Sequence, residues 1–169
     1  EYADAVLEFV PSQVISFGQF SERYPDGVVM SRETGFGRNY GRNPYEGYDS
    51  GSMKPFLFRG EIDDRLWSGV AHVLAAEIND VPKAYPFDEI RETGVINDSI
   101  DETSIVIFYQ SGVATALGES VIANGRDIGT AGMYESTVDG QLLTFTSNDD
   151  GIFTDEQTNS TWNAFGEAI

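Results

Sequence analysis

The chain has 169 residues and no cysteine, and its 28 acidic and ten basic side chains give a formal net charge of −18. Such a surface repels nucleic acid and anionic membranes, so we expect neither as a partner. The lack of cysteine excludes disulfides, thiol nucleophiles and thiolate metal sites. Forty per cent of the residues are hydrophobic, which suffices for one domain, residues 1–169, with its own core.

Several features indicate an exported protein. No apolar run reaches the roughly 18 residues of a membrane span, so we expect no transmembrane segment. The chain begins at Glu1 without Met, which is typical of a mature terminus left after a signal or anchor is removed. We expect an extracellular or cell-surface location, in a halophilic or marine setting where salt screens the self-repulsion. Sequons at Asn97 and Asn159 would suit a secreted glycoprotein.

The first third of the chain predicts extended segments and then a long loop. Residues 6–17 contain two strand-like apolar runs, separated by a proline. A Pro-Asp-Gly turn at residues 25–27 leads into a further extended run at residues 28–30. From Gly35 to Ser52 the sequence is rich in Gly, Asn, Arg and Tyr and shows no strand or helix period, so we expect an ordered loop.

The middle of the chain predicts a hairpin, a short helix and a central strand. Alternation over residues 70–78 indicates a strand, and the turn at residues 79–82 returns the chain as a hairpin. Residues 86–92 predict a short helix, with proline in its first turn and acidic residues following it. Residues 104–109 are the most hydrophobic run and the expected central strand, with residues 114–117 as a pairing partner.

The last third of the chain predicts two tight turns. Asp139-Gly140 between extended runs favours a type I′ hairpin, with residues 142–146 as the returning strand. A second turn falls at residues 148–151. The whole pattern predicts a mainly β fold: a compact antiparallel sheet or barrel-like domain with long loops and at most one or two short helices.

A series of different short motifs follows a recognisable order along the chain. The motifs are Ser31-Arg32-Glu33-Thr34-Gly35, the run Asn39-Tyr40-Gly41-Arg42-Asn43-Pro44-Tyr45-Glu46-Gly47-Tyr48-Asp49, Lys83-Ala84-Tyr85-Pro86, Gly94-Val95-Ile96-Asn97-Asp98, Ile107-Phe108-Tyr109, Asp127-Ile128-Gly129, Val138-Asp139-Gly140, Leu143-Thr144-Phe145 and Ser160-Thr161-Trp162-Asn163. In this order they resemble the exported bacterial and archaeal family called domain of unknown function 3179, over roughly residues 7–169.

The resemblance implies a secreted or lipid-anchored origin but no established activity. Many relatives place a Cys-x-x-Cys-like or selenocysteine segment directly after the tyrosine that matches Tyr109. Here the two positions are Gln110 and Val113, and neither side chain supplies the thiolate that redox or metal chemistry would need. We therefore expect no redox function in this chain.

The common catalytic and metal motifs are incomplete. His72 is the only histidine, and no Gly-x-Ser-x-Gly elbow accompanies it, so we expect it to be packed and hydrogen-bonded. Asn148 and Asp150 resemble part of a calcium loop, but Thr146 and Gln157 stand where its anchoring Asp and Glu belong. We predict no catalytic residue, no metal site and no cofactor.

The Gly35–Ser52 loop is the best candidate for binding. It offers aromatic faces and arginine forks, which suit sugars, carboxylates or a partner chain. Long loops in compact domains are usually functional. The alternative is a loop packed on its own tyrosines and held by Arg–Asp pairs, with Arg32 and Asp49 as one pair. The predicted binding residues are Arg38, Tyr40, Arg42, Asn43, Tyr45 and Tyr48.

Apolar residues near the N-terminus suggest self-assembly. Val6, Leu7, Phe9 and Val10 form an apolar segment that can add to the sheet edge of a neighbour. The domain would then be a subunit of a surface fibre or layer, with other copies of itself or cell-surface components as partners. The alternative is an ordinary edge strand within its own sheet.

Three functional hypotheses follow. We favour a non-catalytic extracellular structural or self-associating domain over an enzyme, because the common catalytic constellations are missing. The first alternative is a ligand- or carbohydrate-binding module centred on the Gly35–Ser52 loop. The second is a carboxylate-dependent hydrolase, since 28 acids offer many pairs.

Overall fold

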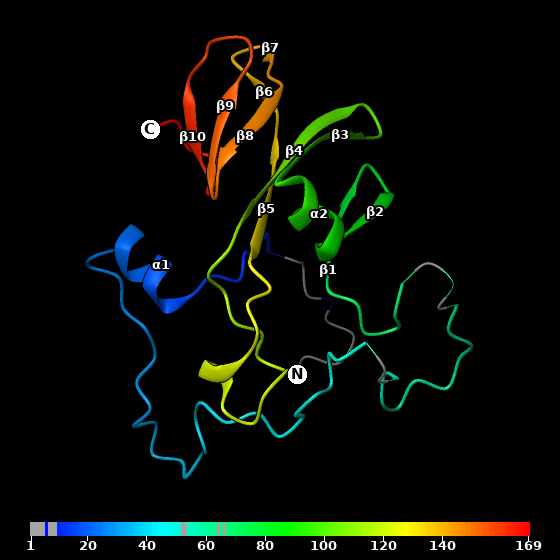
Figure 1. The fold of residues 1–169 in the computed structure, drawn as a ribbon, viewed down its shortest axis with the longest axis vertical. Coiled ribbons are helices and arrows are strands. Elements are labelled where there is room, and N and C mark those ends of the chain that lie inside the picture. The colour runs from blue at the N-terminus through cyan, green and yellow to red at the C-terminus, as the bar shows by residue number, and fades with distance from the viewer. Residues whose placement is uncertain (1–5, 7–9, 52–53, 64, 66) are drawn as a thin grey trace.

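The computed structural model describes residues 6, 10–51, 54–63, 65 and 67–169. In this part of the chain, the strands lie between residues 73 and 163, whereas residues 24–72 run as loops. Figure 1 shows the last strands at one end of the molecule and these loops at the other. The elements are α1 (Phe17–Arg23), β1 (Val73–Ile78), β2 (Val81–Pro86), α2 (Phe87–Thr93), β3 (Val95–Ile100), β4 (Thr103–Gln110), the 3-10 helix η1 (Ile122–Asn124), β5 (Thr130–Glu135), β6 (Thr137–Val138), β7 (Gln141–Leu142), β8 (Phe145–Asp149), β9 (Ile152–Asp155) and β10 (Thr161–Asn163).

Strand β4 is the centre of the fold, as its hydrophobicity predicts. It lies between β3 and β5 in an antiparallel three-stranded sheet. Because successive side chains of a strand point to opposite faces, β4 contributes to two separate cores. Ile105 and Ile107 pack on one face with Ile90 of α2, and Val106 and Phe108 pack on the other face with the C-terminal strands.

The hairpin β1–β2 and helix α2 cover the first face of this sheet. Asn79 and Asp80 form the two-residue turn, and both have positive φ, as a type I′ hairpin requires. Pro86 stands directly before the first residue of α2 and makes no capping hydrogen bond with its side chain, and Gly94 ends the helix with φ of 73°. The predicted hairpin and short helix are therefore confirmed.

The antiparallel sheet β10-β9-β8 covers the second face. The ring of Phe153 is fully buried and stacks on Phe108 with 4.2 Å between ring centroids. Asp155 is also fully buried, and its carboxylate accepts hydrogen bonds from Thr158, Ser160 and the indole of Trp162. Burial alone would raise the pKa of Asp155, but these hydrogen bonds outweigh it and lower the pKa to about 2.

The expected strands at residues 6–17 are wrong where the structure describes them. Residues 10–16 form no strand, and Phe17 begins helix α1. Ser16 and Gln19 form a reciprocal capping box: each side chain accepts a hydrogen bond from the other residue's backbone N–H. Residues 28–30 are exposed and outside any strand, so that expected extended run has no pairing partner among the described residues.

Two pairings near β4 also differ from expectation. Residues 114–117 do not pair with β4, because β3 and β5 occupy both of its edges, and Ala114 instead bridges Asp127. The expected strand at residues 142–146 is split, because β7 ends at Leu142 and β8 begins at Phe145. The Asp139-Gly140 turn is confirmed, with positive φ at both residues.

The fold class is mainly β with two α-helices among the described residues, as predicted. The barrel-like form is not found: the described strands form separate antiparallel sheets of two or three strands, and none closes on itself.

Candidate ligand-binding site

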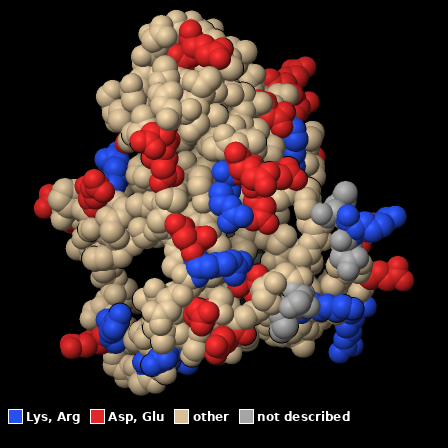
Figure 2. Space-filling model, viewed as in Figure 1, with Lys and Arg blue, Asp and Glu red and all other residues tan. Residues whose placement is uncertain are grey.

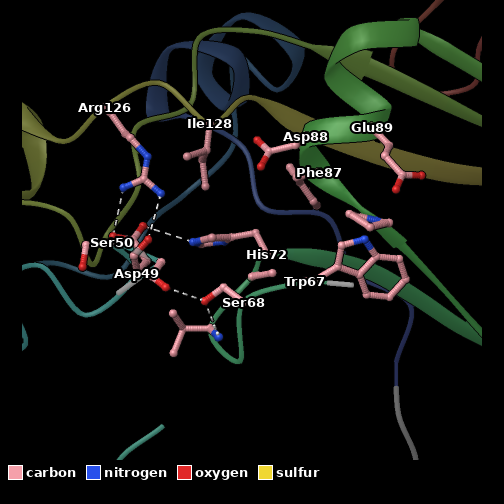
Figure 3. A pocket seen from close by; sticks show the side chains of 14 residues that line it. Asp49, Ser50, Trp67, Ser68, His72, Phe87, Asp88, Glu89, Arg126 and Ile128 are labelled. Carbon is pink, nitrogen blue, oxygen red and sulfur yellow. Dashed lines mark hydrogen bonds and ion pairs between the residues drawn. The ribbon is translucent and has the colours of Figure 1, made fainter. Parts of the chain in front are cut away.

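A cavity of about 700 Å³ lies where the loops meet the sheet domain. Its lining comes from four segments: residues 49–51, residues 67–72, the start of α2, and residues 126–128. Figure 3 shows Arg126 and His72 converging on Asp49 at one side, with Trp67 and Phe87 on the other. The cavity therefore combines a charged side with an aromatic side.

Asp49 is the buried anchor of the charged side, with its side chain only 2% exposed. Its Oδ2 accepts a hydrogen bond of 2.5 Å from the Thr115 hydroxyl and lies 3.1 Å from Nε2 of His72. Its Oδ1 accepts one of 3.0 Å from Nη1 of Arg126, whose Nη2 also donates to the Asp49 backbone carbonyl. Burial would raise the pKa of Asp49, but the hydrogen bonds from Thr115, Arg126 and His72 together lower it.

These contacts fix the roles of the three charged or titratable groups. An ionised Asp49 only accepts hydrogen bonds, so Nε2 of His72 carries the hydrogen toward it. In the neutral imidazole, Nδ1 then keeps a free lone pair. The His72 side chain is 29% exposed and that of Arg126 is 51% exposed, so both reach the cavity while Asp49 stays behind them. The expectation of a packed, hydrogen-bonded histidine is confirmed.

The opposite side of the cavity carries two aromatic rings and two carboxylates. Phe87 packs edge-on against His72 at 6.3 Å between ring centroids, and the backbone N–H of Phe87 donates to the His72 carbonyl. Trp67 is 41% exposed and lines the same cavity. Asp88 and Glu89 stand in the first turn of α2, and Asp88 accepts a hydrogen bond from Arg91. The cavity thus offers aromatic faces together with carboxylate acceptors.

Four of the predicted binding residues line a second hollow. Arg38, Tyr40, Arg42 and Asn43 surround a hollow of about 860 Å³. Asn43 is buried, and its side chain bonds the Glu119 carbonyl and the Tyr45 N–H, so it holds the loop rather than facing a ligand. The structure therefore leaves three of these four side chains available for binding.

The other two predicted binding residues lie outside that hollow. Tyr45 stacks on Phe56, and the Tyr48 hydroxyl accepts a hydrogen bond from the Phe56 N–H. The predicted Arg32–Asp49 pair is wrong, because Asp49 binds Arg126, His72 and Thr115 instead. Tyr45 and Tyr48 also contact each other, with 6.3 Å between ring centroids, so these two tyrosines pack on each other and on Phe56 beyond the loop.

The predicted glycosylation sites and the described residues of the predicted assembly segment lie outside both hollows. Both atoms of the Asn97 amide bond the backbone of Phe145, and this pair joins β3 to β8. Asn159 lies exposed in a turn with φ of 57°. Glycosylation of these two residues stays a prediction. Val6 and Val10 are exposed and in no strand, whereas Leu7 and Phe9 lie outside the described residues.

The calcium-like segment is a β-hairpin. The carboxylate of Asp150 accepts hydrogen bonds from the backbone and hydroxyl of Ser111. Among the described residues, no group of three or more His, Asp or Glu side chains is placed to hold a metal ion. None of the helices in this part of the chain is long and apolar enough to cross a membrane.

Gln110 and Val113, which replace the Cys-x-x-Cys-like segment that the resemblance implies, have ordinary contacts. Gln110 ends β4, and its side-chain oxygen accepts a hydrogen bond from Gln19 of α1. Val113 is 5% exposed. Asp127 accepts hydrogen bonds from the N–H groups of Gly112, Val113 and Gly129, which fix the turn after β4. These side chains provide packing and hydrogen bonding at the turn.

Sequence reasoning missed Trp67, Thr115 and Arg126 and did not connect Asp49 with His72. The partners of Asp49 are 23 to 77 residues away in the chain, so no local spacing indicates them. The one available signal was the rarity of the residue types, since the chain has one histidine and two tryptophans.

Neither a curated protein nor a solved structure matches this chain. A family model described as "Protein of unknown function (DUF3179)" matches residues 1–169. The match covers the whole chain and confirms the resemblance that the ordered motifs indicate. The chain therefore belongs to the DUF3179 family.

Proposed function

We propose that this protein is a binding module for a polyhydroxylated ligand, a carbohydrate, held in the cavity beside His72 and Arg126. The observation that carries the proposal is the buried Asp49 carboxylate, which fixes both side chains at the cavity wall. A pre-organised polar wall lowers the entropic cost of binding. The volume of about 700 Å³ lies within the usual range of small-ligand sites.

The mixed chemistry of the cavity supports a sugar over a simple ion. A sugar presents an apolar C–H face together with hydroxyl groups that both donate and accept. Trp67 and Phe87 supply faces for the first, and Arg126, His72, Asp88 and Glu89 supply donors and acceptors for the second. The acidic residues of α2 weigh against a strongly anionic ligand in this cavity.

Binding is better supported than hydrolysis. Glycoside hydrolysis needs two carboxylates flanking the reacting bond, one of them a general acid with a raised pKa. Asp49 is held ionised by its partners, and its pKa is lowered. Asp88 is bound by Arg91, and its side chain is 86% exposed.

The test is calorimetric titration of the protein with neutral oligosaccharides, comparing Trp67→Ala with the wild type. We expect the variant to weaken binding by about tenfold, since a buried aromatic face contributes of the order of 1.5 kcal/mol. Phe36→Ala is the control, because Phe36 is 73% exposed and lies outside the cavity lining. Equal binding by Trp67→Ala and the wild type would contradict the proposed site.

Self-association at a cell surface is the second candidate. Apolar side chains of the N-terminal segment are strongly exposed: Val10 is 80%, Val14 is 79% and Phe17 is 69% exposed. A second copy of the chain would bury them. The acidic charge would suit an extracellular, saline location, where salt screens the self-repulsion.

Sedimentation velocity in high and low salt tests this candidate. We expect oligomers that are strengthened by salt, which screens the repulsion between acidic copies. The double variant Val14→Ser/Phe17→Ser should then be monomeric. A wild-type protein that is monomeric in both buffers excludes self-association under these conditions.

A further inference from the structure

The basic side chains divide into two groups along the chain. Five of them form ion pairs with acids: Arg23, Arg65, Lys83, Arg91 and Arg126. The other five form no ion pair with any described acid: Arg32, Arg38, Arg42, Lys54 and Arg59. Acids outnumber bases by 28 to ten, so a cation left without a partner is unexpected. All five of these side chains fall within residues 32–59.

The two ends of the molecule differ in surface charge. Figure 2 shows basic and acidic side chains side by side at the end that carries the loops, and acidic side chains alone at the opposite tip, where β8 and β9 lie. Residues 32–59 contain five bases and three acids, so this segment is locally positive on a protein with a net charge of −18. Local positive charge of this kind selects anionic groups at short range.

Arg38 and Arg42 share the hollow of about 860 Å³ described above. The backbone beneath them is fixed on both sides: Arg42 bridges Val121, and the Asn43 N–H donates to the Ser120 carbonyl at 2.9 Å. The hydroxyl of Tyr40 is bound to that of Thr34 at 2.6 Å, which positions the ring at the edge of the same hollow. The two guanidinium groups thus stand on an anchored loop around a concave surface.

We propose that this hollow is a second binding site, which takes an oxyanion group, a carboxylate or sulfate, on a sugar-sized ligand. Guanidinium groups bind such oxyanions with two parallel hydrogen bonds, and an unpaired arginine keeps all its donors for them. The hollow is much larger than an inorganic ion, and Tyr40 and Pro44 provide an apolar surface beside the charges. An acidic oligosaccharide has both features.

The site is independent of the cavity beside His72. The two linings share no residue, and the second contains no carboxylate side chain. The preferred ligands also differ, since the first cavity has acidic residues in its lining and this one has arginines.

The test is titration with an oligomer of uronic acid or sulfated sugar, beside a neutral oligomer of the same length, at fixed salt. We expect the acidic oligomer to bind the wild type and Arg38→Gln/Arg42→Gln to weaken that binding by at least about tenfold. Arg59→Gln is the matched control, because it removes a positive charge that pairs with no described acid and lies outside the hollow. Its affinity should stay within about twofold of the wild type.

Each outcome then decides between explanations. Equal loss in Arg59→Gln, or equal binding of the neutral oligomer, overturns the proposal, because net charge or sugar contact alone would explain the result. If inorganic sulfate displaces the acidic oligomer from the same arginines, the site recognises the oxyanion group, and a small free anion is sufficient for binding. Unchanged affinity of Trp67→Ala for the acidic oligomer separates this site from the first cavity. Arg38 and Arg42 are exposed, so both variants should fold, which circular dichroism checks.

Discussion

The molecule has two parts that are held together in different ways. In residues 73–169 the buried residues are mainly hydrophobic, and they pack on both faces of β4. Among the described residues before 73, the buried ones are Asn43 and Asp49, and both are polar. The loop part therefore has no apolar core of its own in the described region.

Polar contacts with residues 115–126 take the place of that core. Asp49 binds Thr115 and Arg126, and Asn43 binds the backbone of Glu119 and Ser120. Hydrogen bonds are directional and contribute little net free energy, whereas apolar burial is non-directional and cooperative. The loop part should therefore open without unfolding the sheets, and both proposed sites depend on this separately anchored layer.

The largest expected effect comes from Phe153→Ala in the hydrophobic part. Phe153 is fully buried and stacks on Phe108 between two sheets, so its removal leaves a cavity. We expect a loss of about 3–5 kcal/mol in the free energy of unfolding, measured by urea denaturation. Phe36→Ala, at an exposed loop position, should change it by less than about 0.5 kcal/mol. Similar losses in both variants would contradict the two-part division.

Most elements of this hydrophobic part could be predicted from the sequence, because the patterns that indicate them are local. The β1–β2 hairpin, α2, β4 and the Asp139-Gly140 turn each follow from periodicity or turn chemistry within a few residues. The strand prediction for residues 10–17 is wrong because their apolar run also contains a capping box, which favours the start of a helix.

The candidate sites were only partly predictable for the opposite reason. Arg38, Tyr40 and Arg42 could be grouped from the sequence because they are neighbours in one loop, and they line one hollow. Asp49, His72 and Arg126 come from three distant segments, and their contact depends on how the loop docks. The Arg32–Asp49 pair is expected only because the two residues lie at the edges of the loop, and the buried contacts of Asp49 with His72, Thr115 and Arg126 replace it.

A smaller loss in the free energy of unfolding is expected from replacing Asp155, the buried carboxylate of the C-terminal sheet. The pKa of Asp155 falls from the usual 3.8 to about 2 in the folded protein. A carboxylate whose pKa is lower in the folded protein than in the unfolded chain stabilises the folded state. This stabilisation is fully present above the pKa of the unfolded chain, and it is lost as the pH falls to the pKa of the folded protein. Asp155→Asn should therefore cost about 2 kcal/mol at pH 7, since hydrogen bonds to the charged group are lost.

The pH dependence identifies the cause of that loss. The difference between Asp155→Asn and the wild type should be constant above about pH 5 and should shrink from pH 4 toward pH 2. Urea unfolding at each pH measures it. A difference that stays constant down to pH 2 would mean that Asp155 acts through packing rather than through its charge.

The smallest effect on global stability is expected from Asp49→Asn, because Asp49 holds only the loop layer. The asparagine keeps the volume but loses the ion pair with Arg126, and its amide nitrogen faces groups that also donate. The loop should then open more often while the sheets stay folded. Native-state hydrogen exchange measures this amide by amide.

We expect faster exchange at the Gly47 and Tyr48 amides, which donate to Gly118 and Leu117 across the docking contact. The amides of β4 should exchange as in the wild type. Asp63→Asn is the control, since Asp63 is exposed and, among the described residues, its ion pair is with nearby Arg65. If Asp49→Asn instead accelerates the loop and β4 equally, the two parts unfold as one unit. The polar contact at Asp49 would then be part of the global core, and ligand binding at either site would stabilise the whole molecule rather than the loop layer alone.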